Sequence, residues 1–379
     1  HILPFFIPHL GCPHQCIFCN QIHISGQRQK PSAEEVAAAI VAYQKINPGV
    51  KPELAFYGGS FTALLPAEQR YYLQPALDGL KAGFLAGIRV STRPDCIDVR
   101  TIQRLKRFQV QTVELGVQSM CDDVLRIAER GHTAEDSKQA LQLLKQYDMK
   151  VGVQLMSGLP GESEESFWLG SQRILMLHPD FVRIYPTVVL RNTKLAEYYQ
   201  AGSYQPYSLQ KAVEITANLN LLCQYWQIPV IRMGLQAEEG LTEQILAGPY
   251  HPAFGHLVQS NIWCRKVKQV IGMLSTPADF LAILVNRRDI AKVVGQNRCN
   301  IPYYEHLLQS GQRKFQIKGW ELPPETVGVM TKDGNIFYLE EKDFLALQAK
   351  VPMPALTEMT AAFLKAQRWY ASQGIATVQ

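Results

Sequence analysis

Strand-like and helix-like segments alternate along the first half of the chain, and this alternation limits its fold more than any other feature. Six runs rich in apolar or β-branched residues are predicted as strands, at Ile2–Ile7, Leu54–Tyr57, Ile88–Ser91, Thr112–Val117, Val151–Met156 and Phe181–Tyr185. Five stretches with helical periodicity lie between them, at Ala33–Ile46, Glu68–Leu80, Thr101–Phe108, Ala134–Tyr147 and Glu164–Leu177. Strands joined by helices pair in parallel, because a parallel connection must cross over the sheet. The sequence therefore predicts an α/β fold whose parallel sheet is open or curled into a partial barrel, with its chemistry on loops after the strand C-termini.

The second half of the chain predicts a different arrangement. A helix is expected over residues 208–226, a strand at Val230–Met233 and a Gly/Pro-rich loop at Gly248–Gly255. A small α+β unit follows, with segments at Leu281–Val285, Arg288–Val294, Ile301–Leu308, Lys314–Ile317 and Thr326–Met330, and then a helix at Ala355–Ser372. We therefore expect a core domain at 1–240, a connecting loop and helix at 241–274, a small α+β domain at 275–340 and a helical extension at 341–379.

Composition excludes several classes of protein. The chain is 47% hydrophobic and 19% charged, which excludes a disordered chain. No apolar run reaches about 18 residues, so we expect neither a membrane span nor a membrane partner. No signal peptide is visible, although the chain begins at His1 rather than Met, which leaves its true start open. The 8 cysteines are too few and too unevenly spaced for a secreted disulfide scaffold, which favours the cytoplasm.

The positive charge of the chain is concentrated in one stretch. Residues 261–320 hold ten Lys/Arg against three Asp/Glu, a net charge of +7, whereas the whole chain carries +5. Either this stretch forms a solvated face, or it meets an anionic partner such as a nucleic acid.

Three cysteines lie within eight residues directly after the first predicted strand. Cys12, Cys16 and Cys19 have the spacing C-x3-C-x2-C. Three thiolates on one short loop can ligate three irons of a 4Fe–4S cluster and leave the fourth iron open. The alternative is structural zinc, which needs a fourth ligand, and the candidates are His9, His14 and His23.

This spacing, with the aromatic Phe18 before the third cysteine, resembles that of the radical S-adenosylmethionine (SAM) superfamily. The segment Phe56–Thr62 follows the second strand and resembles the Gly-Gly-Glu-type motif of that family, with Ser60 in place of the commoner Glu. The resemblance implies a partial parallel (β/α)6 barrel that binds a 4Fe–4S cluster and SAM. It also implies the SAM-binding residues, namely Phe18, Gly58, Gly59, Ser60, Thr62, Ser91, Arg93, Gln118, Arg130, Gln154 and Met156.

The resemblance also assigns roles within this set. Gln118 and Arg130 would lie on the methionine carboxylate side, and Gln154 would face the ribose. Met156 and Phe18 would pack on or near the adenine. Glycines after the second strand would let the backbone approach the methionine amino group closely.

Later motifs resemble one branch of the superfamily. Glu114–Ser119, Arg130–Thr133 and Val153–Gly161 occur in the order found in oxygen-independent coproporphyrinogen oxidase, its haem-chaperone relatives and the Elongator catalytic subunit. The sequences of Glu114–Ser119 and Arg130–Thr133, and the sequence of the later segment Tyr185–Leu195, are similar to those of Elongator-like proteins. Two features differ: the Elongator subunit spaces its first two cysteines more widely, and we see no acetyltransferase domain in this sequence.

The resemblance implies reductive cleavage of SAM to a 5′-deoxyadenosyl radical, fed by a one-electron donor such as flavodoxin or ferredoxin. We expect modification of RNA, most simply tRNA; the alternatives are a small-molecule substrate such as a tetrapyrrole, and a non-catalytic haem-chaperone-like role. Candidate catalytic residues are Arg183, Tyr185 and Arg191. Candidate substrate contacts are Arg232, Gln236, His251 and His256.

The small domain contains a turn that resembles the KH-domain pattern I-G-x-x-G-x-x-I, which clamps nucleic-acid backbone between two helices. Arg298 stands in place of the second glycine, which adds a cation. The alternative is an ordinary helix–turn–helix. The candidate RNA contacts are Arg287, Arg288, Lys292, Gly295, Gln296, Asn297 and Arg298.

The cysteine loop generates a direct prediction about metal content. Cys12→Ala, Cys16→Ala and Cys19→Ala should each abolish a reconstituted 4Fe–4S cluster, because each thiolate holds one iron. Replacement of any of the other five cysteines should leave the iron content unchanged. Elemental and sulfide analysis of anaerobically purified protein measures this, and one zinc per chain without iron or sulfide would contradict it.

Overall fold

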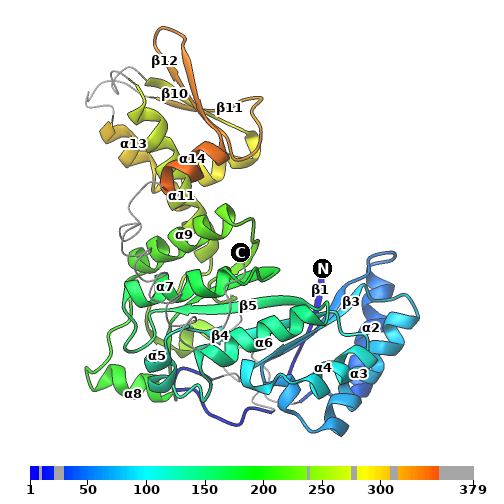
Figure 1. Cartoon of the computed structure of the whole chain (residues 1–379). Coiled ribbons are helices and arrows are strands. Elements are labelled where there is room, and N and C mark those ends of the chain that lie inside the picture. Colours follow the sequence, from blue (N-terminus) through cyan, green and yellow to red (C-terminus); the bar gives the residue numbers. More distant parts are fainter. Residues whose placement is uncertain (8–10, 21–29, 237–239, 275–279, 308–314, 350–379) are drawn as a thin grey trace, which may run out of the picture. The chain divides into compact units, whose positions relative to one another are not determined.

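The computed structural model describes the chain apart from residues 8–10, 21–29, 237–239, 275–279, 308–314 and 350–379. The chain divides into two compact units, His1–Val258 and Gln259–Gln379 (Figure 1). Within the described ranges, no helix combines the length and apolar character that a membrane-spanning segment needs.

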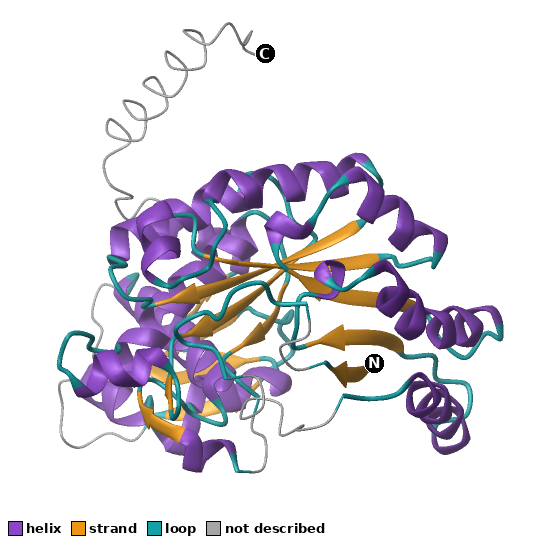
Figure 2. Ribbon diagram, turned by 90° about the horizontal axis from the view of Figure 1, so that it is seen from below, coloured by secondary structure: helices purple, strands orange, loops and turns teal. Residues whose placement is uncertain are grey.

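The first unit is built on a sheet of seven parallel strands. Their order in space follows their order in the chain, β1-β2-β3-β4-β5-β6-β8, so each crossover moves one strand along the sheet. The strands fan out into an open, curled sheet (Figure 2). Their bounds are β1 Ile2–Phe6, β2 Glu53–Tyr57, β3 Gly87–Thr92, β4 Thr112–Gln118, β5 Lys150–Ser157, β6 Phe181–Pro186 and β8 Val230–Met233. The predicted partial parallel barrel is confirmed, with Val230–Met233 as its seventh strand.

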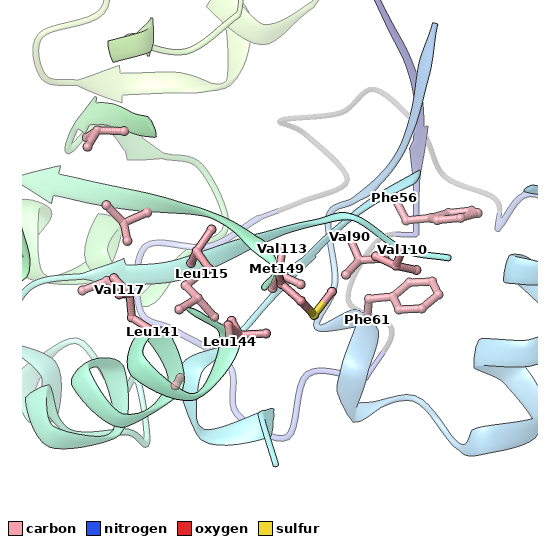
Figure 3. Packing of buried hydrophobic residues seen from close by; sticks show 14 of the residues in the cluster. Phe56, Phe61, Val90, Val110, Val113, Leu115, Val117, Leu141, Leu144 and Met149 are labelled. Carbon is pink, nitrogen blue, oxygen red and sulfur yellow. The ribbon is translucent and has the colours of Figure 1, made fainter. Parts of the chain in front are cut away.

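The two faces of this sheet differ in chemistry. Side chains alternate between faces along a strand, so one residue in two faces the helices. That face is apolar and holds the main core, including Phe56, Val90, Val113, Leu115 and Val117, against which Leu144 packs from a helix (Figure 3). The alternate positions are polar and include Tyr57, Arg89, Ser91, Glu114, Gln154, Arg183 and Tyr185. A polar inner face is unusual for a parallel sheet, because such strands are normally buried on both sides, and it marks this face as the place for chemistry.

Local sequence explains where the helices begin. Ser32, Thr133 and Ser163 each cap a helix by accepting a hydrogen bond from the backbone N–H three residues on. Two helices begin earlier than predicted, one because Pro66 occupies its first turn and the other because Asp98 caps it. The helices are α2 Ala33–Ile46, α3 Pro66–Lys81, α4 Val99–Arg107, α5 Asp122–Ile127, α6 Ala134–Gln146, α7 Glu164–Leu175, α8 Lys194–Gln200, α9 Leu209–Tyr225, α10 Leu241–Gln244 and α11 Phe254–Gly272.

Several short elements were not predicted from the sequence. Helices α5, α8 and α10 have four to seven residues, too few to show a helical period. The two-stranded pair β7 (Val189–Leu190) and β9 (Ile245–Ala247) joins segments that are more than fifty residues apart. The loop predicted at Gly248–Gly255 ends at Ala253, because α11 begins at Phe254.

The second unit has a four-stranded sheet with the order β11-β10-β12-β13. Strands β10 and β11 are parallel and are joined through helices α12 and α13, whereas the other neighbours are antiparallel. The bounds are β10 Phe280–Val285, α12 Ile290–Val294, α13 Ile301–Leu307, β11 Gln316–Gly319, β12 Val327–Thr331, β13 Ile336–Leu339 and α14 Glu341–Ala349. The small α+β domain is therefore confirmed; β13 and α14 are additional, and the predicted helix at Ala355–Ser372 lies outside the described residues.

A buried ion cluster lies inside the second unit. The ammonium of Lys266, whose side chain is 1% exposed, lies 2.9 Å from Glu325 Oε2 and 4.7 Å from the ring centre of Trp263. Lys292 pairs with Glu325 Oε1 at 2.6 Å and with Asp289 at 2.9 Å. Two of the ten basic residues in 261–320 are thus neutralised within the fold, and Lys292 is not a free cation.

Candidate active site

The cysteine loop lies against the turn that follows β2. Gly11 has φ +70°, and a Cβ on it would lie 2.3 Å from the carbonyl oxygen of Ser60. On its other side, Ile17 donates its N–H to Ala128 O at 3.3 Å and accepts from the N–H of Leu195 at 2.8 Å. The loop is therefore held between the ends of three elements that are far apart in sequence.

The three thiols lie on this short loop in a shielded position. Cys16 is buried, whereas Cys12 and Cys19 are partly exposed. Burial, and then the neighbouring Cys16, raise the pKa of the Cys12 thiol, while the backbone of Ser60 and the cation of Arg130 act in the opposite direction. His14 is exposed on the loop, and His9 and His23, the other candidates for a zinc ligand, lie outside the described residues.

Arg130 joins the cysteine loop to the sheet. Its Nη1 lies 3.0 Å from Cys16 Sγ, and its Nη2 donates to the carbonyl of Gly116 on β4 at 2.6 Å. A Cβ on Gly116 would lie 3.2 Å from that Nη2 and 3.0 Å from Nε2 of Gln118, so the glycine makes room for both side chains. Gln118 itself is buried, with φ +66°, at the end of β4.

Hydroxyl groups link the ends of β2 and β3. Ser60 Oγ and Thr62 Oγ1 lie 2.9 and 2.6 Å from Thr92 Oγ1, and the N–H of Arg93 donates to Ser60 Oγ at 3.3 Å. Gly58 has φ +100°, which favours glycine. Ser60 stands where the similar Gly-Gly-Glu-type motif commonly has Glu. Its hydroxyl links the segment after β2 to the end of β3 through hydrogen bonds.

A group of buried charges covers the polar inner face of the sheet. Glu114, whose side chain is 0% exposed, lies 2.6 Å from Arg89 Nη1 and 2.8 Å from Arg183 Nε. Its Oε2 also accepts from Gln154 Nε2 at 3.0 Å, and that amide donates in addition toward Ser91 at 3.3 Å. Burial alone would raise the pKa of Glu114, but Arg183 and Arg89 outweigh burial and hold the pKa below its usual value.

Two further residues complete this group of charges. Glu53 pairs with Arg89, and Tyr57 receives a hydrogen bond from Arg183 Nη2 at 2.9 Å. Two arginines thus face two glutamates. Sequence reasoning missed Glu53, Arg89 and Glu114; the signal that could have found them is polar residues at alternate positions of strands that are otherwise apolar.

The structure brings most predicted SAM residues to one edge of the sheet. The cysteine loop, Gly58–Thr62, Ser91–Arg93, Gln118 and Arg130 are linked through the contacts above. Gln154 and Met156 lie on the polar face of β5, and Met156 is in register with Tyr185 on β6. Phe18 packs with a small cluster around Ile17 and Leu195.

The predicted catalytic residues and substrate contacts are more scattered than the predicted SAM-binding residues. Burial raises the pKa of Tyr185, and Arg183 beside it acts in the opposite direction. Arg191 is exposed and donates to the carbonyl of Glu243 at 3.1 Å, while Arg232 donates to Gly234 O at 3.3 Å. Of the remaining predicted residues, Gln236 lies on the loop after β8 and His256 lies in α11. His251 lies on the loop between β9 and α11, where its Nδ1 accepts from the N–H of Ala253 at 3.0 Å.

A second carboxylate, half-buried and missed from the sequence, holds the loop after β5. Glu162 accepts from the N–H of Gly158 at 2.8 Å and from Ser119 Oγ at 3.0 Å. The hydroxyl of Tyr204 donates to Gly158 O at 2.6 Å. Glu162 therefore ties the end of β5 to the end of β4, next to Gln118.

The residues at this edge fit an anionic iron–sulfur cluster with SAM beside it. Three thiols lie on one loop, and Gly11 and Gly131 let that loop pack closely, because a Cβ on either would lie 2.3 Å from Ser60 O or from the ring of His14. Two buried nitrogens, Arg93 Nη1 and Arg130 Nε, have no hydrogen-bond partner in the part of the chain that the structure describes. Buried N–H groups of cations are normally satisfied, so these two suit an anionic group.

Comparison with known proteins agrees with this geometry. Residues 6–169 match the radical SAM superfamily, and residues 179–263 match the C-terminal domain that accompanies it. The chain belongs to the radical SAM superfamily, whose members are enzymes that bind a 4Fe–4S cluster and SAM.

Within that superfamily the chain is Elongator-like, as the motifs predicted. It is 31% identical over 248 residues to a tRNA uridine(34) acetyltransferase of Dehalococcoides mccartyi, covering 56% of this chain and 54% of that protein. It is 28% identical to Elongator complex protein 3 of Mus musculus, covering 58% of this chain and 44% of that protein. The chain thus spans about half the length of the curated relatives it matches. In fold, it is similar to the Methanocaldococcus infernus Elp3 structure, with a TM-score of 0.56 at 24% identity, covering 74% of this chain and 69% of that chain.

Glu162 generates a prediction about the dependence of stability on pH. Burial raises the pKa of its carboxyl from 4.5 to about 7, so the folded state holds this proton more tightly than the unfolded state. Its contribution to the free energy of unfolding is therefore fully present below about pH 4.5 and is lost as the pH rises to about 7. The loss is on the order of 3 kcal/mol. Tyr204 and Tyr207 beside it do not titrate in this range, because burial raises both of their pKa values.

Urea unfolding of Glu162→Gln and wild type between pH 4.5 and 8 measures this. The variant should lose the decline that wild type shows in this range. Glu165→Gln, which changes an exposed carboxylate three residues on, should keep the wild-type profile. Parallel profiles for wild type and Glu162→Gln would contradict the prediction.

Proposed function

We propose that this protein is a radical SAM enzyme that modifies tRNA. The observation that carries the proposal is the cysteine loop held against the ends of β2, β3 and β4 beside the polar face of the sheet. When bound, the cluster and SAM supply a one-electron cleavage that allows hydrogen abstraction from an unactivated carbon. The tRNA-modifying names of the similar proteins support the substrate class.

The chain's own residues bind and orient the cofactors in this proposal. Cys12, Cys16 and Cys19 hold the cluster. The backbone of Gly58 and Gly59 lies where a methionine amino group can approach closely. Further contacts come from Gln118 and Ser91, from Gln154 toward the ribose, and from Met156 and Phe18 toward the adenine.

Gln154 has a defined orientation in this arrangement. Its Nε2 donates to Glu114 and Ser91, so its Oε1 remains as the acceptor for a ribose hydroxyl. Arg183 is held by Glu114 and Tyr57, and we propose that it positions Tyr57 and Tyr185 rather than contacting substrate. Tyr185 then remains as a candidate substrate contact on the polar face.

The balance of charge on the polar face favours RNA over a tetrapyrrole. Propionate groups would need free cations there. Glu53 and Glu114 already pair with Arg89 and Arg183, and among the described arginines of this face that leaves Arg232 without a carboxylate partner. A nucleobase is neutral and can be recognised by amide and hydroxyl groups. The sugar–phosphate backbone of such a substrate would need cations elsewhere, and the second unit carries them.

We propose the second unit as the RNA-binding surface. Arg287, Arg288 and Arg298 are exposed there. The turn at Gly295–Arg298 has positive φ at Gly295, Asn297 and Arg298, so it is a tight loop between α12 and α13. Exposed cations on such a loop suit phosphate contacts. Of the predicted RNA residues, Lys292 is the exception, because Asp289 and Glu325 hold it.

An exposed aromatic residue follows β11 in the same unit. Trp320, which is 42% exposed, follows β11, and its backbone N–H donates to Val285 O at 2.8 Å. Next to it in the chain, Gly319 lies under the stem of Arg287: a Cβ on this glycine would lie 2.7 Å from Arg287 Cγ. Exposed aromatic rings and cations together are the combination that binds single-stranded nucleic acid, and this unit carries both.

The proposal also includes a reductant and a compartment. A cluster of this kind receives its electron from a small carrier of the flavodoxin or ferredoxin type. None of the eight cysteines, all of which lie in the described ranges, forms a disulfide, which suits the reducing cytoplasm.

Turnover by anaerobically reconstituted protein tests the function. We expect 5′-deoxyadenosine to form faster with total tRNA than without it, and one tRNA nucleoside to change mass. Stimulation by tetrapyrroles or other metabolites instead of tRNA would favour the small-molecule alternative. Absence of 5′-deoxyadenosine under all conditions, with the cluster intact, would favour a non-catalytic role.

The basic surface generates a separate binding prediction. Arg298→Glu, and Arg287→Glu with Arg288→Glu, should each weaken the binding of fluorescent tRNA, because each removes phosphate contacts and adds repulsion. The salt dependence should flatten by about 0.7 in log–log slope for each phosphate that the variant no longer neutralises, the value for single strands. The control is Arg107→Glu, an exposed residue at the end of α4, which precedes β4 and so lies at the opposite end of the strands from the cysteine loop. Equal affinity for all variants at two salt concentrations would contradict RNA binding by this unit.

A further inference from the structure

We propose that the four-stranded sheet of the second unit binds unpaired nucleotides of RNA, with a base stacked on Tyr338 and a phosphate at Lys318. The inference rests on the proposed function, because it assumes that the second unit binds the RNA substrate. It deepens that proposal by naming the form of RNA that this unit takes, which is single strand rather than duplex. We call the sheet face that carries these two side chains the outer face.

The register of the strands defines the outer face. Leu284 of β10 pairs with Lys318 of β11 on one side and with Gly328 of β12 on the other, and Gly328 pairs in turn with Tyr338 of β13. Residues opposite each other on neighbouring strands lie on the same side of the sheet, so these four residues share one face. The next row of the outer face holds Gln316, Ala282, Met330 and Ile336.

The opposite face of the sheet packs against helices. Gly319 follows Lys318 on β11 and faces the other way, and a Cβ on it would lie 3.5 Å from Ile290 Cδ1 of α12. The ring centre of Phe315, just before β11, lies 5.9 Å from that of Tyr304 on α13. Because helices occupy that side, a ligand of this sheet must approach from the outer face.

Tyr338 supplies an aromatic ring at one edge of the outer face. A Cβ on Gly328 would lie 3.1 Å from Tyr338 Cδ1 and 3.2 Å from its Cε1, so the glycine lets the ring lie close to the neighbouring strand. The residue is nevertheless 45% exposed, since β13 is an edge strand. A ring that is held against the sheet and still open to solvent loses little conformational freedom when a base stacks on it.

The charges at the other edge favour an anionic occupant. Lys318 is exposed on β11, three strand spacings from β13, which is about 14 Å. On the helix side of the same strand, the stem of Arg287 lies against Gly319. Glu340, two residues after the aromatic ring, is paired with Lys342 at 3.0 Å. The β11 edge can therefore hold a phosphate while a base of the same strand of RNA stacks at the β13 edge.

This pairing of a ring with a cation selects unpaired RNA. Bases within a duplex are already stacked on each other, whereas unpaired bases present a free face to an aromatic side chain. Phosphate contacts release counterions and so depend on salt, but stacking does not. Loss of the ring of Tyr338 should therefore lower affinity by the same factor at every salt concentration. Loss of the charge of Lys318 should change the salt dependence itself.

The test is a titration of the full chain with fluorescent single-stranded oligouridine, and with an RNA duplex of equal length, at several salt concentrations. Tyr338→Leu keeps an apolar cover over Gly328. It should weaken single-strand binding at least about fivefold, the lower limit for one stacked base, with an unchanged salt slope. Tyr338→Phe should bind like wild type, and Lys318→Gln should flatten the log–log slope by about 0.7. Tyr71→Leu is the matched control, because Tyr71 is 44% exposed on α3 of the first unit, and it should change nothing.

The outcomes separate this inference from the proposed function. Wild-type affinity in Tyr338→Leu, or tighter binding of duplex than of single strand, would overturn this inference alone, provided that Arg298→Glu still weakens tRNA binding. Absence of RNA binding by the wild type would overturn RNA binding by this unit altogether. A dimer that Tyr338→Leu dissociates, with RNA affinity unchanged, would show that a second copy of the chain occupies the outer face instead.

If Tyr338→Leu fails to fold, the wild type decides. Oligouridine that carries a photoreactive uridine should crosslink to the peptide that contains Tyr338, and excess unlabelled oligouridine should suppress the crosslink. Crosslinks confined to other peptides would overturn the inference.

Discussion

The first unit depends on the neutralisation of Glu114. This carboxylate is fully buried on a central strand, and an unpaired ion in that place would be strongly destabilising. Arg89 and Arg183, from strands on both sides of β4, supply the compensating charge. The same carboxylate orients Gln154 through its amide. One ionic group thus links β3 to β6 and keeps a polar face within a parallel sheet, which is where the chemistry of the fold takes place.

The cysteine loop depends on a second set of long-range contacts. Ser60 O lies under Gly11, and Arg130 reaches Cys16 across 114 positions of the chain. Hydroxyl contacts between Ser60, Thr62 and Thr92 hold the surface on which the loop lies. The loop is therefore positioned by contacts with the strand ends as well as by its own sequence.

Sequence reasoning succeeded where the signal is local. The strand–helix alternation, the C-x3-C-x2-C spacing and the Gly-Gly turn depend on neighbours along the chain, so the barrel and its cysteine loop were predictable. The Glu114–Gln154, Glu162–Ser119 and Arg130–Cys16 contacts join residues that are 40 or more positions apart, and no local pattern encodes such pairings. Helices α5 and α8 were missed because six or seven residues cannot establish a period. Lys266 counted as surface charge in the sequence, yet it is buried against Trp263 because Glu325, 59 positions away, neutralises it.

These pairings divide the charges of the first unit into two regions with different electrostatics. On the polar face of the sheet, Glu53 and Glu114 pair with Arg89 and Arg183, while Arg232, in register with Arg183, donates to the carbonyl of Gly234. At the cysteine loop, Arg93 is offset by Asp95, whereas Arg130 faces only a thiol and a carbonyl. A positive charge left in a shielded place attracts negative charge more strongly than one in water. Within the described ranges Arg130 thus lacks a carboxylate partner, and it lies beside Cys16, one of the three cysteines proposed to hold the cluster.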